Sequence, residues 1–359
     1  MGGKLLYNLK GIGRMIMPRA LTQARLESTI ARIFTLPDTA LEAIAKRVAH
    51  YHKISEAFSV QPLPHGSHTR LSLTQPHYGK LGDNKLTKEH SSVYFYDSYE
   101  WTRYFPDSYE WNYEFSDVNY YLTTPAITKT RPIDSRVEAA LESKAGLDTD
   151  TCAPQTNHTS ILLQLEKHRH FSFIHDPIPY EKKRDLLFFR GACPQEHRSR
   201  FLHQYFSHPL CDLGHTGGAD EHPEFTKPKI PKKEHLHYKF LLSLEGNDVA
   251  SNLKWILGSN SLCIMPKPRY ESWFMEEKLE ANVHYALLDD DYGNLDSLLE
   301  FFTAHPKDAK EIIHNANAYC QAFQNPRIEE ACNLLVLRKY FYLSDQGDLS
   351  QDERALLGC

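Results

Sequence analysis

Two segments in the second half of the chain carry residue types suited to binding a phosphate-like anion. In the first, the apolar run Phe240–Leu244 predicts a buried strand, Glu245–Asp248 interrupts it, and Val249–Leu257 has helical spacing. A strand, a glycine-containing turn and a helix N-terminus make an anion site, because the first amides of a helix lack partners and the dipole there is positive. Many strand–turn–helix units of α/β proteins share this pattern, so it does not establish a ligand by itself.

Arginine residues supply the second anion-binding feature. The apolar stretch Leu186–Phe189 predicts a strand that ends in Arg190-Gly191-Ala192, and Arg198 and Arg200 follow on a predicted helix. A guanidinium suits a diphosphate because its planar fork bonds two oxygens at once. The alternative is that these are surface arginines that pair with acidic neighbours or face solvent.

Signals for a metal site are weak. Asp148–Asp150 and Asp289–Asp291 imitate the Asp-x-Asp metal motif, but they fall in a predicted loop and after a predicted strand, where solvated turns are the better interpretation. The 20 histidines form no His-Glu-x-x-His pattern. The seven cysteines form no Cys-x-x-Cys pair and are odd in number, which favours reduced thiols over a disulfide framework or a zinc knuckle.

Length and charge narrow the class of protein. The 359 residues are enough for two domains of ordinary size, and a hydrophobic content of 41% is typical of a soluble globular protein. The net charge of -5 gives no electrostatic reason to expect nucleic acid as a partner. No apolar run approaches the ~20 residues that a membrane-spanning helix needs.

Residues 1–25 differ from the rest of the chain. They carry five basic residues and no acidic residue, and their apolar residues recur near helical spacing. Lys10 and Arg14 interrupt the apolar region, which argues against a secretory signal. The pattern predicts a basic amphipathic helix that lies on an anionic membrane surface or packs its apolar face on its own domain.

The elements that must position these residues follow from periodicity. Strands and helices alternate from residue 186 to residue 323, which predicts a parallel, doubly wound domain. Further expectations are helices within 27–60, loops at 62–90, 135–158 and 207–234, a helix at 270–279, a strand at 283–288 and a last helix at 328–342. The aromatic block at 94–121 fits either a carbohydrate-binding surface or the edge of a core.

Several motifs together resemble glycosyltransferase family 90, which includes protein O-glucosyltransferases, fungal capsule-associated xylosyltransferases and bacterial lipopolysaccharide-core enzymes. The matching residues are FFRGA at 188–192, EHLHYKFLLSLEGNDVASNLKW at 234–255, SNSL at 259–262, NVHYALL at 282–288 and AKEIIHNANAY at 309–319. The match covers roughly residues 180–325, and the first half matches only around 117–132. The form GNDVASNLKW followed by MPKPRYESWFME is more similar to the bacterial lipopolysaccharide branch.

This resemblance implies an α/β fold of the GT-B type, in which two Rossmann-like domains face a central cleft. The expected divisions are 1–180 as the acceptor-side domain, 181–335 as the UDP-sugar-binding domain, and 336–359 as a C-terminal helix and tail packing back toward the first. The implied activity is inverting transfer of a glucose- or xylose-type sugar from a UDP-sugar to a lipopolysaccharide-core or capsule glycan. No cofactor and no metal are expected, since the UDP-sugar is a co-substrate.

The family's donor-binding positions can be placed on this sequence. They fall on Ala192, Arg198 and the segment Asn247, Asp248, Val249, Ala250, Ser251 and Asn252. The expected donor-binding set also includes the neighbouring residues Arg190, Gly191, Gly246 and Lys254. The animal enzymes have an arginine where Asn252 stands and a serine where Ala192 stands. Neutralisation of the diphosphate is therefore expected to rest more on Arg198, Lys254 or helix amides.

The family's catalytic base is an aspartate ahead of a proline-containing stretch, and the best match is Asp117. Such a base takes the acceptor hydroxyl proton while amides and arginine hold the leaving charge on UDP. Asp107, Glu110 and Glu114 are rival candidates, because the resemblance has gaps in this region.

Two alternatives stay open: transfer to a protein acceptor, and a non-catalytic carbohydrate-binding relative. The absence of a signal peptide and the odd cysteine count argue against the first. An intact donor segment argues against the second, while Asn252 in place of the arginine of the animal enzymes argues for it. We expect a cytoplasmic protein, peripheral on the inner face of the bacterial inner membrane through residues 1–25.

Overall fold

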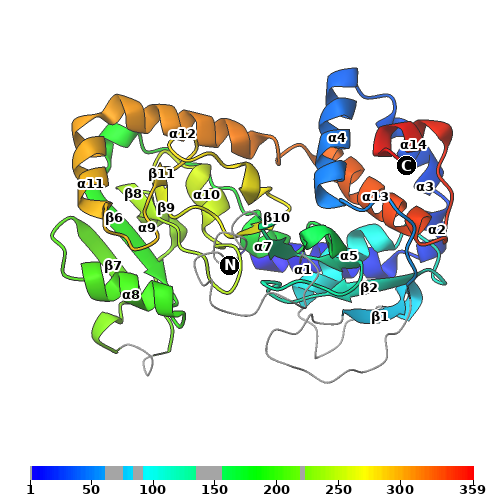
Figure 1. The fold of residues 1–359 in the computed structure, drawn as a ribbon, viewed down its shortest axis with the longest axis horizontal. Helices are drawn as coiled ribbons and strands as arrows, with labels where there is room; N and C mark the ends of the chain where they lie inside the picture. Colours follow the sequence, from blue (N-terminus) through cyan, green and yellow to red (C-terminus); the bar gives the residue numbers. More distant parts are fainter. Residues whose placement is uncertain (1, 61–75, 84–91, 135–155, 219–222) are drawn as a thin grey trace, which may run out of the picture. The chain divides into compact units, whose positions relative to one another are not determined.

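The computed structural model describes residues 2–60, 76–83, 92–134, 156–218 and 223–359 (Figure 1). The chain divides into two compact units. Unit 1 comprises Met1–His168, Tyr270–Trp273 and Asn325–Cys359, and unit 2 comprises Arg169–Arg269 and Phe274–Gln324. Each unit combines helices with parallel strands, which confirms the predicted α/β class. The three domain divisions expected from the sequence stay predictions.

The helices of unit 1 come from both ends of the chain. They are α1 (Gly2–Ile16), α2 (Arg19–Gln23), α3 (Leu26–Ile33), α4 (Asp38–Tyr51), α5 (Ser92–Thr102), α13 (Pro326–Leu343) and α14 (Gln351–Leu357), and α7 (Lys167–His170) crosses the division between the units in the sequence. Pro18 separates α1 from α2 and Pro37 precedes α4, because proline lacks the amide that a helix interior needs. The predicted helices within 1–25, 27–60 and 328–342 are confirmed.

Unit 1 has a four-stranded sheet in the order β1-β2-β3-β5. Its strands are β1 (His77–Lys80), β2 (Glu110–Glu114), β3 (Ala126–Thr128) and β5 (Ser160–Leu162). Strands β2, β3 and β5 run parallel, and β1 pairs antiparallel with β2. The prediction of loop at 62–90 is wrong at β1, because this edge strand is formed by pairing with β2 and has no apolar run of its own.

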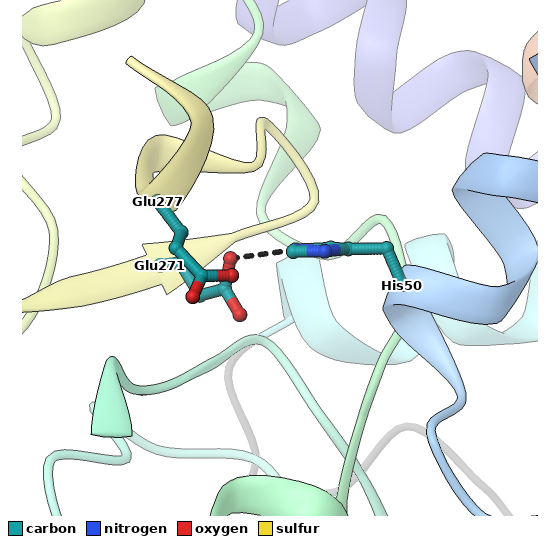
Figure 2. Close-up of side chains that lie close together, drawn as sticks. All are labelled: His50, Glu271 and Glu277. Carbon is teal, nitrogen blue, oxygen red and sulfur yellow. Dashed lines mark hydrogen bonds and ion pairs between the residues drawn. The ribbon is translucent and has the colours of Figure 1, made fainter. Parts of the chain in front are cut away.

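A second, two-stranded sheet of unit 1 joins distant parts of the chain. Strand β4 (Thr130–Pro132) pairs antiparallel with β10 (Tyr270–Ser272). The helix predicted at 270–279 is therefore wrong: the segment forms β10 and later a 3₁₀ turn at Glu276–Lys278. The cause is tertiary, since the buried Glu271 carboxylate accepts a 2.7 Å bond from Arg131 and lies 2.7 Å from His50 (Figure 2).

Unit 2 is built on a five-stranded parallel sheet in the order β11-β9-β8-β6-β7. Its strands are β6 (Arg184–Gly191), β7 (Cys211–His215), β8 (Tyr238–Leu242), β9 (Leu262–Met265) and β11 (Ala286–Leu287). The sheet confirms the parallel strands predicted for 186–323. The expected strand at 283–288 is reduced to the two residues of β11.

Strand β7 lies inside the predicted loop at 207–234, so that expectation is wrong there. Its sequence has no apolar run, and the strand forms by pairing along β6. The Asp212 carboxylate accepts bonds of 2.7 Å from Arg190 and 2.9 Å from Lys227, which fixes this edge of the sheet through charge.

Helices cover both faces of the unit 2 sheet. They are α8 (Glu196–Tyr205), α9 (Lys232–His235), α10 (Leu253–Leu257), α11 (Leu295–Ala304) and α12 (Pro306–Gln321). Leu187 and Phe189 of β6 join one buried cluster with residues of α8 and α11. Phe188 points to the other face, where its ring stacks on Tyr238 at 4.2 Å between centroids. Six cysteines lie in the described part of the chain, and all six are free, as predicted.

Candidate functional site

The sheet of unit 2 has a topological switch point between β6 and β8. These two strands are neighbours, but β7 follows β6 on one side and β9 follows β8 on the other. The connections that follow β6 and β8 therefore leave toward opposite faces of the sheet. Ligands of open parallel sheets bind at such a point. The residues that end these strands are Gly191 and Leu242.

The two segments that hold most of the expected donor-binding residues meet at this point. Ala192 directly follows β6 and is exposed, and the segment 246–252 follows β8 after a short link. Gln195 donates a 3.1 Å bond to Asn247, so the two loops contact each other. The sheet thus brings together the two segments that the sequence marked as anion-binding.

Arg198 ties the two loops at the switch point. Its guanidinium donates to three backbone carbonyls: Ala192 at 2.7 Å, Leu244 at 2.6 Å and Glu245 at 2.8 Å. Burial lowers the pKa of Arg198 below its usual value, although an arginine stays charged near neutral pH. These bonds take three of the five N–H donors of a guanidinium. Arg198 shapes the loops and keeps a positive charge beside them.

The helix expected at Val249–Leu257 begins later, at Leu253, and has five residues. The amides of 247–252 therefore belong to turns, and the expected anion site on helix amides is not formed by a helix. The cause is local competition for hydrogen bonds. Asn252 donates a 3.0 Å bond to the Leu242 carbonyl, and the Gly246 amide donates to the Asp248 carbonyl at 2.9 Å.

Two of the expected donor-binding side chains are engaged away from these loops. Arg190 donates to Asp212 of β7 and packs over Phe188 at 4.5 Å. Lys254 is fully buried and forms a 2.5 Å ion pair with Glu276. Each cation would have to leave its carboxylate to reach a ligand. Among the other expected residues, Asp248, Val249 and Ala250 are buried and Ser251 is half-buried.

Three residues beside the loops had not been singled out from the sequence. Glu245 accepts bonds from the Arg269 side chain and amide, both at 2.9 Å. His197 lies 2.7 Å from the Glu245 carbonyl, and burial lowers the pKa of its imidazole. The signal available in the sequence was position: Arg269 follows the predicted strand at 262–265, and strands of one parallel sheet end at one edge.

Unit 1 brings a second group of charged residues to one sheet edge. The parallel strands β2, β3 and β5 end at Glu114, Thr128 and Leu162. The charged residues that follow these ends are Asp117, Lys129 and Glu166. The edge that holds the expected base, Asp117, is therefore a carboxyl-end edge of parallel strands, where α/β proteins place ligands.

Lys129 links the two carboxylates of this group. Its ammonium lies 2.6 Å from Asp117 and 3.0 Å from Glu166. The Lys129 side chain is 3% exposed and Glu166 is 7% exposed, whereas Asp117 is 36% exposed. Tyr94 lies alongside, with its ring centroid 5.9 Å from the ammonium, and burial raises the pKa of its hydroxyl above the usual value. Asp117 is the member of the ion-paired trio most open to solvent.

The rival carboxylates lie elsewhere in unit 1. Asp107 precedes β2, and it is held by Arg19 at 2.6 Å and Gln23 at 3.1 Å. Glu110 starts β2, where the Tyr78 hydroxyl bonds its carboxylate. Asp107 and Glu110 therefore lie at the amino end of β2, whereas Asp117 follows its carboxyl end. Glu114 ends β2 and is 7% exposed.

The structure also bears on the two acidic segments and on the presence of a membrane-spanning helix. Asp289–Asp291 forms an exposed turn after β11, where the Asp290 carbonyl accepts a bond from Arg200 and the Asp291 carboxylate accepts one from the Gly293 amide. Asp148–Asp150 lies outside the described residues. In the part of the chain that the structure describes, no helix is long and apolar enough to cross a membrane.

Comparison with known proteins agrees with the resemblance seen in the motifs. The model of glycosyl transferase family 90 matches residues 167–333. A curated relative, the O-glucosyltransferase LpsA of Dichelobacter nodosus, is 34% identical over 341 residues, which cover 95% of this chain and 96% of the relative. Identity at this level over nearly the whole of both chains shows common descent, and the chain belongs to glycosyltransferase family 90.

Proposed function

We propose that this chain is an inverting transferase that moves a sugar from a UDP-sugar to a lipopolysaccharide-core or capsule glycan, without a metal ion. Glucose is the first candidate for the sugar, since the relative is an O-glucosyltransferase by name. The strongest support in the structure is the switch point of unit 2, because both anion-binding segments of the sequence meet there.

In this proposal, the loops after β6 and β8 hold the UDP. Backbone amides of the segment 247–252 and the charge of Arg198 would face the diphosphate. A diphosphate leaving group needs such preorganised donors and positive charge, because its negative charge grows as the glycosidic bond breaks. Arg190 and Lys254 would act on the donor indirectly, through the strands and loops that their ion pairs fix.

Unit 1 would supply the base. Asp117 takes the proton from the acceptor hydroxyl as the acceptor oxygen bonds to the anomeric carbon, and the bond from that carbon to the phosphate oxygen breaks. The bonding electrons leave with UDP, so atoms and charge balance without a further reactant. Lys129 orients Asp117, and Glu166 holds Lys129 from its other side.

The two units would correspond to the two halves of a GT-B enzyme, with the donor on unit 2 and the base on unit 1. The acceptor class follows from the resemblance to the bacterial lipopolysaccharide branch. Such acceptors are carried on lipids, so we also propose that the chain works as a peripheral protein at a membrane surface.

Calorimetry with UDP, followed by a panel of UDP-sugars, tests this function. UDP should bind equally well with EDTA and with Mg²⁺, and UDP-glucose with a lipopolysaccharide-core acceptor should release UDP. A strict requirement for a divalent cation would overturn the metal-free mechanism. Binding of UDP without transfer to any glycan would favour the non-catalytic relative, and transfer to a peptide would favour the protein acceptor.

A further inference from the structure

Helix α1 (Gly2–Ile16) packs on unit 1 through one face. Tyr7 donates a 3.1 Å bond to the Val93 carbonyl, and its ring meets Tyr96 edge-on at 6.0 Å between centroids. Gly11 lies against the same Tyr96 ring, so close that an added Cβ would come within 2.5 Å of it. Arg14 forms an ion pair with Glu100 of α5. The packed face of α1 is therefore marked by positions 7, 11 and 14.

The opposite face of α1 is apolar and exposed. Leu5, Leu9, Ile12 and Ile16 are 63%, 56%, 46% and 77% exposed. At about 100° per residue, positions 5, 9, 12 and 16 cluster on the side of the helix away from positions 7, 11 and 14. We call these four residues the α1 apolar face. An apolar surface that the helix does not use for packing on its own unit is available to a partner.

Basic residues accompany the α1 apolar face. Lys4 and Lys10 are exposed and lie on the helix between its packed and apolar faces. Residues 1–25 contain five basic side chains and no carboxylate side chain. Among them, Arg14 and Arg19 are paired within unit 1 with Glu100 and Asp107. Lys4 and Lys10 are therefore positioned to contact negatively charged groups of a partner that buries the α1 apolar face.

We infer that the α1 apolar face docks on a bilayer that contains anionic lipid, with α1 lying parallel to the surface. Apolar side chains would enter the acyl boundary while Lys4 and Lys10 contact the headgroups, which is the arrangement of interfacial amphipathic helices. Charge favours this partner over a second copy of the chain, since two copies would bring like charges together. The inference gives a residue-level basis to the proposed membrane contact, and it does not depend on the transfer chemistry.

Sedimentation of the full chain with phosphatidylglycerol–phosphatidylcholine vesicles tests this docking. The wild-type protein should sediment with these vesicles at low salt and stay in solution with phosphatidylcholine alone. The double variant Leu9→Glu/Ile12→Glu should lose more than about tenfold in partitioning, because two apolar side chains leave the acyl boundary. Lys4→Gln and Lys10→Gln should each cost about fivefold.

Phe301→Glu is the matched control, because Phe301 on α11 of unit 2 is 45% exposed and Ile12 is 46% exposed. It should bind the vesicles like the wild type. UDP affinity, measured in parallel without lipid, should be the same in all variants, so failure of docking and failure of the enzymatic proposal are distinguishable. Equal vesicle binding by the wild type and the Leu9/Ile12 double variant would overturn the docking. So would a concentration-dependent dimer that this variant abolishes, in a protein that does not bind vesicles.

Discussion

Lys129 donates a 3.0 Å bond to the Glu166 carboxylate and so joins the carboxyl ends of the neighbouring strands β3 and β5. Glu166 has a φ of 52°, in the left-handed region that residues with side chains seldom adopt. Backbone strain of this kind persists where surrounding contacts over-determine it, and it clusters at functional sites. The buried Glu166 thus offsets part of the charge of Lys129, and Asp117 is the carboxylate of the pair that is more open to solvent.

Asp117→Asn should abolish most of the transfer activity. The change keeps the shape of the side chain and removes the proton acceptor, so the rate should fall by roughly two to four orders of magnitude. UDP affinity by calorimetry should not change, because the proposed donor-binding residues are in unit 2. Asp107→Asn, Glu110→Gln and Glu114→Gln are the controls. If one of them lost the activity while Asp117→Asn kept it, the base would be that residue.

Substitutions at Lys129 and Glu166 should move the pH–rate profile in opposite directions. In Lys129→Met, two carboxylates remain without their shared cation, so protonation becomes easier and the acid limb of kcat/KM should shift to higher pH. In Glu166→Gln, the lysine acts on Asp117 alone, and the acid limb should shift to lower pH. Profiles that coincide with the wild type, in variants with normal melting temperatures, would exclude these residues from tuning the base.

Arg198→Ala should weaken UDP binding by about 2 kcal/mol, or roughly 30-fold in Kd, the scale of a charged hydrogen bond. The variant should also unfold at a lower temperature, because the carbonyls of Ala192, Leu244 and Glu245 lose their donor. Arg200→Ala is the control from the same helix, since Arg200 is exposed and donates to the Asp290 carbonyl. Unchanged UDP affinity in a folded Arg198→Ala protein would remove Arg198 from the donor site.

Glu271 should make unit 1 sensitive to acid. Burial alone would raise the pKa of this carboxyl, but the Arg131 guanidinium and His50 outweigh burial and hold the pKa at about 2, against an ordinary value of 4.5. The native state therefore binds fewer protons than the unfolded state. The stabilisation, about 3 kcal/mol, is complete above the unfolded pKa and is lost as pH falls from about 4.5 toward 2.

Urea unfolding at several pH values measures this contribution. Glu271→Gln should be less stable than the wild type near neutral pH, and the difference should shrink as the pH is lowered through that window. Glu311→Gln, at an exposed position on α12, is the control and should leave the curve unchanged. A difference that stays constant from neutral to acid pH would contradict the assignment.

The fold was predictable where local pattern and tertiary structure agree. The apolar runs that became β6, β8 and β9 are buried and central, so hydrophobicity alone located them. Strands β7 and β10 were missed because their stability comes from partners far away in the sequence: Asp212 is fixed by Arg190 and Lys227, and β10 by pairing with β4.

The same distinction applies to the candidate site: local sequence pattern located some of its parts, and tertiary contacts determine the others. The loops after β6 and β8 could be located because glycine and arginine follow apolar runs, whereas Asp117 was singled out by resemblance and its role stays a prediction. The start of α10 could not, since the side-chain amide of Asn252 binds the Leu242 carbonyl, a contact that periodicity does not report. Glu166 is 37 residues from Lys129, and that separation in the sequence hid its ion pair with Lys129 beside Asp117.

Because unit 1 contains both the first and the last residues of the chain, the two units cannot complete folding at the same stage of synthesis. Unit 2 has all of its residues once Gln324 has been made, whereas unit 1 also needs residues 325–359. Within unit 1, Glu329 of α13 pairs with the buried Arg47 at 2.6 Å and accepts a bond from Trp273. The N-terminal part of unit 1 therefore cannot complete its packing until residues 325–359 have been synthesised, and until then the surface that α13 buries stays exposed. During synthesis, this early segment is where chaperones should bind.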